Sequence, residues 1–295
     1  MTALAADAGQ TGASVAIICG GGGFPIAVAD AATRRGRRVV LFPIRGWADP
    51  AMVTRFPHYW LSLGQLGGAL RRAHREGCRE IVFIGNVIRP SIWGLRFDWT
   101  SLRLLPRVIK LFRGGDNHLL SSLGEIVEGF GLRIVGAHEV APEILVPAGT
   151  LGRHQPSPRD IGDIACGFSL LAAMGAYDVG QAAVVADQRV LAIEAAEGTD
   201  QMLARVAKMR AERRISLPAK AGVLVKAPKP GQDRRYDLPS IGTRTVEAAI
   251  EAGVAGIAVE AAGAITIDLQ NLIQAADHAG LFLVGFSPAR AGPAA

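Results

Sequence analysis

The chain has 295 residues, of which 49% are hydrophobic and 20% are charged, so it can form one or two domains with proper cores. This composition excludes a disordered chain, a disulfide-stapled miniprotein and a fibrous repeat. The net charge of +6 is unevenly distributed: residues 1–155 carry 18 basic and 11 acidic side chains (+7), whereas residues 156–295 carry 14 and 15 (−1).

The first half alternates between apolar runs and helical stretches. Strands are expected at 14–19, 38–44, 80–84 and 132–135, and helices at 25–36, 66–77, 101–112 and 117–130. Such alternation predicts a parallel sheet whose strands are joined by crossover helices. A Pro/Gly-rich polar stretch ends this half, so we expect a first domain over 1–147 and a linker over 148–159.

The second half, 160–295, is expected to form a separate mixed α/β domain. Helices are predicted at 160–174, 200–212, 243–251 and 269–279, and strands at 182–186, 190–194, 222–226, 256–260, 264–268 and 281–286. A short polar turn separates the first two strands, which predicts a hairpin.

The compartment follows from the cysteines and the N-terminus. Cys19, Cys78 and Cys166 are odd in number and widely spaced, which argues against a disulfide framework and a cysteine zinc site. The first twelve residues lack a basic region and an apolar core, and no apolar run reaches 18 residues. We therefore expect a cytoplasmic protein, with peripheral contact to the inner face of the inner membrane as an open question.

A glycine-rich turn follows the first strand at 20–23, with Phe24 and Pro25 opening a helix. Such a turn lets backbone N–H groups approach a phosphate or sugar at a helix N-terminus, although a strand-to-helix turn can also need glycine for geometry alone. The P-loop pattern is missing, and the dinucleotide fingerprint fails at Pro25 and Ile26. A nicotinamide-dependent dehydrogenase is therefore disfavoured.

Polar residues also follow later strands of the first half. Asn86 and Arg89 come after the third strand, Asp116 lies in a Gly-Gly-Asp-Asn stretch, and His138 follows the fourth strand. Ligands of open α/β sheets bind at the carboxyl ends of the strands. Helix capping by Asn86 or Asp116, and a structural role for His138, remain the alternatives. The six histidines form no zinc-binding spacing.

The most informative stretch is 226–242, which contains Lys226, Lys229, Gln232 and Asp237 among three prolines. Prolines stiffen a loop and favour a preformed site. Lysine suits phosphate, and aspartate suits Mg²⁺. Only five of the 32 basic residues are lysines, yet three of them lie within 220–229. A solvated surface loop is the alternative.

Two further segments bear on function. Thr199 and Asp200 precede a helix, where either can cap it or offer oxygen to a metal or phosphate. Residues 93–113 combine four arginines and a lysine with aromatic and leucine side chains, which fits either an anionic membrane surface or an amphipathic helix packed on the core. These features are too local to indicate nucleic-acid binding.

Taken in order, these motifs resemble one known family. They are the Gly-rich turn with Pro25, GNVIRP at 85–90, GDN at 115–117, AHE at 137–139, DVGQ at 178–181, EGTD at 197–200 and the 226–242 block. The series resembles the LpxI-type UDP-2,3-diacylglucosamine pyrophosphatases of lipid A biosynthesis, from about residue 15 to 286. Phe24 and Asn117 depart from the usual Leu and Asp, and Asn117 weakens any metal-binding role for its position.

The resemblance implies a Rossmann-like N-terminal domain and a distinct α/β C-terminal catalytic domain. It also implies Mg²⁺-dependent hydrolysis of UDP-2,3-diacylglucosamine to UMP and 2,3-diacylglucosamine 1-phosphate, a hydrolase activity on a phosphorus anhydride. The family's essential aspartate matches Asp237, and a homodimer is plausible from the family. A non-catalytic nucleotide-sugar or lipid-binding protein is the competing interpretation.

The chemistry of this reaction suggests a role for each candidate residue. Lys226 and Lys229 would stabilise charge on the phosphoryl and leaving groups, and Asp237 would bind Mg²⁺ or act as general base. Asp200 is the second candidate metal ligand. The residues expected to bind substrate are Gly22, Gly23, Phe24, Pro25, Asn86, Arg89, Asp116, His138, Gln181, Thr199 and Gln232.

Overall fold

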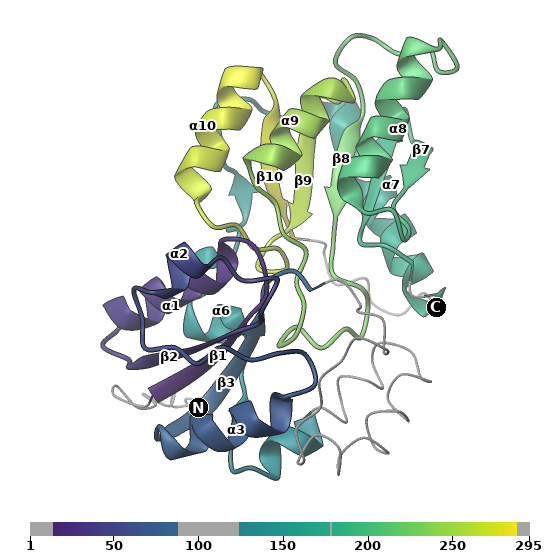
Figure 1. Cartoon of the computed structure of the whole chain (residues 1–295). Helices are drawn as coiled ribbons and strands as arrows, with labels where there is room; N and C mark the ends of the chain where they lie inside the picture. The colour runs from purple at the N-terminus through teal and green to yellow at the C-terminus, as the bar shows by residue number, and fades with distance from the viewer. Residues whose placement is uncertain (1–13, 88–123, 178, 288–295) are drawn as a thin grey trace, which may run out of the picture. The chain divides into compact units, whose positions relative to one another are not determined.

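The computed structural model describes residues 14–87, 124–177 and 179–287 (Figure 1). The contacts between residues divide the chain into two compact units, Met1–Pro142 and Glu143–Ala295. Both units combine helices with a β-sheet, which confirms the α/β class with two domains. Gly149–Thr150 form a strand of the second sheet, so part of the segment expected as a linker over 148–159 belongs to the second unit.

The first unit contains a four-stranded parallel sheet in the order β2-β1-β3-β4. Its strands are β1 (Ser14–Cys19), β2 (Val39–Pro43), β3 (Cys78–Ile84) and β4 (Arg133–Ile134). Its described helices include α1 (Phe24–Arg34), α2 (Pro50–Val53), α3 (Leu66–Arg75) and α6 (Ala137–Val140), and residues 124–128 are also helical. The predicted parallel sheet is confirmed. The helix expected at 101–112 and the first part of that at 117–130 lie outside the described residues.

The sequence of this sheet explains why it needs helices on both sides. Every residue of β2 is buried, and so is β1 from Val15 to Cys19. Strands that are apolar on both faces must be covered on both faces, which crossover helices achieve. Figure 1 shows α1 and α3 on opposite sides of this sheet.

The second unit contains a six-stranded mixed sheet in the order β5-β10-β9-β8-β6-β7. Its strands are β5 (Gly149–Thr150), β6 (Ala182–Ala186), β7 (Arg189–Ile193), β8 (Val223–Lys226), β9 (Gly256–Glu260) and β10 (Phe282–Phe286). Its helices are α7 (Pro158–Met174), α8 (Thr199–Ala211), α9 (Thr243–Glu251) and α10 (Leu269–Ala279), with short 3-10 helices at Pro142–Ile144 and Gly175–Tyr177.

The pairing in this sheet settles two predictions. Strands β6 and β7 are antiparallel neighbours, which confirms the hairpin, and β8, β9 and β10 are parallel. The strand expected at 264–268 is wrong. Only Ile265 pairs there, through isolated bridges to Leu145 and Ser240. Two single bridges on one residue tie loops together but do not extend a strand.

Alternate residues of the strands enter two separate cores. On β8, Leu224 packs into the core beneath α8, α9 and α10, whereas Val223 and Val225 pack beneath α7. Successive side chains of a strand point to opposite faces, so this unit is a three-layer α/β/α arrangement. Figure 1 shows α8, α9 and α10 together along one face of the sheet.

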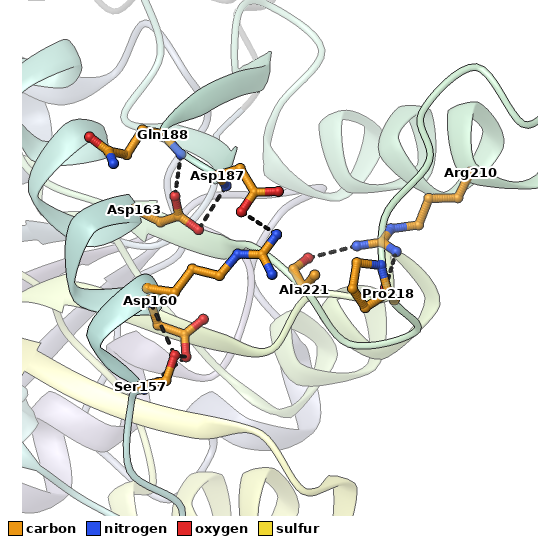
Figure 2. A network of polar contacts seen from close by, with 9 residues as sticks. Ser157, Asp160, Asp163, Asp187, Gln188, Arg210, Pro218 and Ala221 are labelled. Atoms are coloured by element: carbon orange, nitrogen blue, oxygen red, sulfur yellow. Dashed lines mark hydrogen bonds and ion pairs between the residues drawn. The ribbon is translucent and has the colours of Figure 1, made fainter.

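Polar contacts fix the ends of these helices (Figure 2). Ser157 and Asp160 form a capping box at the start of α7, where Pro158 occupies the first turn. Arg210, near the end of α8, donates to the carbonyl oxygens of Pro218 (2.8 Å) and Ala221 (2.6 Å) and so holds the loop that leads into β8. Within the described ranges, no helix has the length and apolar character required to cross a membrane.

Candidate active site

A connected cluster of polar side chains lies at one edge of the second sheet. Strand β8 ends at Lys226, β6 begins beside it, and β7 ends next to β6. The pairing continues beyond the strands, because the backbone of Gln181 pairs with Ala227, and that of Glu194 with Ala182 and Gly180. The edge is the carboxyl end of β8, β9 and β10, where open α/β sheets place their ligands.

Lys226 carries a buried ammonium, with the residue only 6% exposed. Its Nζ donates to Thr199 Oγ1 at 3.0 Å and to the carbonyl oxygen of Ser240 at 2.9 Å. Burial lowers the pKa of Lys226, and the negative charges of Glu194, Asp200 and Asp237 oppose this shift. Because a buried cation needs compensating anions, these three carboxylates belong to the same electrostatic site.

Glu194 accepts two hydrogen bonds directly after β7. Its Oε1 accepts from the Thr199 hydroxyl at 2.9 Å, and its Oε2 accepts from the backbone N–H of Gln181 at 2.9 Å. The Thr199 hydroxyl thus donates to Glu194 while it accepts from Lys226. The sequence pattern assigned Glu194 no individual role in the site.

Asp237 is exposed and is held through one of its two oxygens. The side-chain amides of Gln181 and Gln232 each donate to Asp237 Oδ2 at 2.9 Å. The side-chain Oε1 of Gln232 in turn accepts from the backbone N–H of Lys229 at 3.0 Å and from the Gln181 side-chain amide at 3.3 Å. Among the described residues, Asp237 Oδ1 accepts no hydrogen bond, which makes it the candidate oxygen for a ligand.

The loop that carries Asp237 is pinned at its far end. Leu238 and Ile241 are buried, and the backbone of Ile265 accepts from Ile241 N–H at 3.0 Å and donates to Pro239 O at 2.9 Å. Asp237 therefore precedes a fixed apolar anchor, which supports a preformed site rather than a freely moving loop.

The first unit contributes a second, separate set of predicted residues. Gly20 and Gly85 meet backbone to backbone: a Cβ on Gly20 would lie 2.6 Å from Gly85 C, so only glycine fits. Gly21 and Asn86 exchange backbone hydrogen bonds of 2.8 and 2.9 Å. These loops follow β1 and β3, which are neighbours in the sheet. The strand after β1 in the chain, β2, lies on one side of this pair, and the strand after β3, β4, lies on the other. Such a point is the usual ligand position in open α/β sheets.

The Gly-rich turn has the features of an anion site. Gly22 has a φ of +87°, Gly23 precedes α1 without a side-chain cap, and Pro25 lies in the first turn of α1. Uncapped N–H groups at a helix start can bind a phosphate. His138, on α6 after β4, has a buried Nδ1 that meets no partner in the described residues.

Comparison with known proteins identifies this arrangement. Residues 14–144 match the family model of the LpxI N-terminal domain, and residues 147–284 match that of the LpxI C-terminal domain. The chain belongs to the LpxI family. It is 41% identical over 278 residues to the UDP-2,3-diacylglucosamine pyrophosphatase LpxI of Caulobacter vibrioides. The matched residues make up 92% of this chain and 97% of that protein.

A magnesium ion requires oxygen ligands, and the carboxylates of this site can be compared with that requirement. The described residues contain no cluster of three or more His, Cys, Asp or Glu side chains that could enclose a metal. Asp200 forms an exposed ion pair with Arg244 at 3.0 Å. Mg²⁺ commonly binds one or two carboxylates and completes its shell with water and substrate phosphates. Asp237 fits a site in which one protein carboxylate, water and substrate phosphates share the ion. The described residues do not form a site that encloses the ion with protein ligands alone.

The predicted LpxI site residues fall into three groups. The structure brings together Gln181, Thr199, Lys226, Gln232 and Asp237 in the second unit, with Lys229 in the same loop. It places the glycine-rich turn, Asn86 and His138 after strands of the first unit. Arg89, Asp116 and the basic segment 93–113 lie outside the described residues.

Proposed function

We propose that this protein hydrolyses the pyrophosphate bond of UDP-2,3-diacylglucosamine to UMP and 2,3-diacylglucosamine 1-phosphate, with Mg²⁺, in lipid A biosynthesis. The observation that carries this proposal is the 41% identity over 92% of the chain to a UDP-2,3-diacylglucosamine pyrophosphatase. The polar cluster around Lys226 and Asp237 supports it, because it combines a buried cation with a carboxylate whose negative charge acts on that cation.

The chemistry divides between these two residues. Water adds to phosphorus, one P–O bond of the anhydride breaks, and the departing phosphate oxygen takes the electron pair. Lys226 supplies fixed positive charge, which is strongest in a site with little water. Asp237 Oδ1 would hold Mg²⁺ or accept the proton of the attacking water. When bound, Mg²⁺ would neutralise phosphate charge. Lys229 lies three residues further along and would contact the same phosphates.

The first unit would hold the nucleotide or the sugar phosphate. Its uncapped α1 N-terminus and the neighbouring Asn86 offer donors that suit a phosphate or a base. Asp200 remains the second proposed metal ligand, and this role would require release of Arg244.

The direct test is incubation with UDP-2,3-diacylglucosamine and Mg²⁺, with and without chelator, while UMP is measured. The wild type should release UMP only when metal is present. Asp237→Ala should release none and still bind the substrate. Asp187→Asn, an exposed aspartate at the hairpin turn, is the matched control and should behave as wild type. A wild type that binds substrate but releases no UMP would establish the binding-protein alternative instead.

We also propose that the protein works peripherally at the inner face of the inner membrane. The support is the anionic lipid nature of the substrate and the basic, aromatic sequence of 93–113. Binding to anionic vesicles should be salt-sensitive and should weaken when Arg103, Arg107 and Lys110 become Gln. Binding that does not change in this variant would reject the role of this segment.

A further inference from the structure

Glu194 occupies a position that connects the two charged residues of the site. One oxygen accepts from Thr199, which itself contacts Lys226, and the other accepts from the backbone of Gln181, whose side chain contacts Asp237. A chain of hydrogen bonds therefore runs from the buried ammonium through Glu194 to the Asp237 carboxylate. All of its members lie in the second unit.

The two partners of Glu194 explain why a carboxylate is needed. Both Thr199 and the Gln181 N–H donate to it, so the residue must accept on both oxygens. An ionised carboxylate is acceptor-only, whereas an amide would place an N–H₂ group against one of the two donors. Glutamine at this position would thus leave one donor without its acceptor.

Burial makes the connection to Lys226 matter. The Lys226 ammonium is inside the protein, where an uncompensated charge is costly. Among the carboxylates that favour its charged form, Glu194 is the largest contributor, ahead of Asp200 and Asp237. Asp200 is paired with Arg244, and Asp237 is exposed. Glu194 is the half-buried one and is tied to the lysine through a single hydroxyl.

The hydrogen bonds that lead from Glu194 through Gln181 fix the carboxylate of Asp237. The backbone of Gln181 is held by Glu194, and its amide meets the same Asp237 oxygen as the amide of Gln232. Because Oδ2 accepts from two donors, the rotation of the Asp237 carboxylate is restricted.

We propose that Glu194 is a positioning residue for the hydrolytic reaction, which holds Lys226 through Thr199 and orients Asp237 through Gln181. This inference rests on the proposed function. It assigns Gln181 and Gln232 to the support of Asp237, and Thr199 to the support of Lys226, in addition to any contact with substrate.

The test compares Glu194→Gln with wild type in the UMP-release assay. We expect kcat to fall by about 10- to 100-fold, the usual effect of losing a residue that orients a site. KM should change little, because the lost interactions act on charge that develops in the reaction rather than on bound substrate. Glu212→Gln is the matched control, since that glutamate lies at the other end of α8 and pairs only with exposed cations.

Variants of Thr199 keep the test decisive if Glu194→Gln folds poorly. Thr199→Val removes the hydroxyl between Glu194 and Lys226 and should also lower kcat, whereas Thr199→Ser retains the hydroxyl and should restore it. The double variant Glu194→Gln/Thr199→Val should lose no more activity than Glu194→Gln alone, because both changes break the same chain.

The outcomes separate this inference from the proposed function. A wild type without UMP release would reject the function itself. An active wild type with a Glu194→Gln kcat within about twofold would overturn the positioning role. So would multiplicative losses in the double variant, or a Thr199→Ser variant as impaired as Thr199→Val. A lower melting temperature with unchanged kcat per folded molecule would assign Glu194 to stability alone.

Discussion

The buried ammonium of Lys226 donates to the hydroxyl of Thr199 at 3.0 Å, which ties the end of β8 to the start of α8. Lys226→Met keeps an unbranched side chain that is one heavy atom shorter, and it removes the charge. We expect hydrolysis to fall by about 100- to 1,000-fold, as when a fixed donor to developing charge is lost. The fold lowers the pKa of Lys226, so loss of the charge should offset the loss of its two hydrogen bonds, and the melting temperature should change little. UMP release and a thermal melt measure the two effects, and an active Lys226→Met would exclude Lys226 from catalysis.

The pH dependence should distinguish the charged from the neutral lysine. Burial lowers the pKa of Lys226, so its ammonium is lost at a pH below the ordinary lysine value of about 10.4. Activity should therefore decline as the pH rises through the lowered pKa of Lys226. The stability of the fold should instead increase with pH between the lowered pKa of Lys226 and the ordinary lysine value. In this window the unfolded chain still holds the proton that the folded protein has lost. The free energy of unfolding of wild type, relative to Lys226→Met, should rise through this window; a relative fall would contradict the shift.

Much of this arrangement was visible in the sequence, and the missing parts share one physical cause. The rigid 226–242 loop pointed to Lys226 and Asp237, because lysine scarcity, prolines and carboxylates are local features. The role of Glu194 depends on the register of β6, β7 and β8, which places residues 181, 194 and 226 side by side. Long-range register leaves no local pattern. The incorrect prediction of a strand at 264–268 has the same origin. Residues there are buried by contacts with distant loops, through the two single bridges of Ile265, and not by pairing along a strand.

The β6–β7 turn stores strain that Asp163 offsets. Asp187 and Gln188 both have positive φ, at 53° and 57°, and Asp163 on α7, only 1% exposed, accepts from their backbone N–H groups at 3.2 and 2.5 Å (Figure 2). Positive φ costs a non-glycine residue about 1–2 kcal/mol. Asp163→Ala should lower the free energy of unfolding by about 1–3 kcal/mol, because two partly buried backbone donors lose their acceptor.

The opposite change at this turn provides the control. Replacing Asp187 and Gln188 with Asn and Gly, the pair preferred in such two-residue hairpins, should raise stability by about 0.5–1 kcal/mol. Calorimetry measures both variants. Neither should alter kcat, because the turn lies at the end of β6 opposite Gln181. A loss of stability in the Asn-Gly variant would show that the Asp187 ion pair with Arg159 outweighs the backbone strain.

The three cysteines should differ sharply in reactivity. Burial raises the pKa of Cys19 to about 12 and that of Cys78 to about 11, whereas Cys166 on α7 is partly exposed. The thiolate is the reactive form, so only Cys166 should react with a disulfide reagent in the native protein near neutral pH. Titration should give one thiol in the native protein and three after denaturation, and Cys166→Ser should abolish the native reaction. Rapid native reaction in that variant would show that a buried strand opens.

The contact between Gly20 and Gly85 should make Gly85 more sensitive to substitution than Gly46. Gly85 and Gly46 both have positive φ, at +105° and +82°, but a Cβ on Gly85 would lie 2.8–2.9 Å from Gly20 backbone atoms, whereas one on Gly46 would meet nothing within 4 Å. Gly46→Ala should cost about 1–2 kcal/mol for conformation alone. Gly85→Ala adds a backbone clash and should cost about 3–5 kcal/mol. All four tryptophans precede residue 100, so tryptophan fluorescence during urea unfolding reports on this unit. Equal losses in the two variants would show that the β1 and β3 loops can separate without cost.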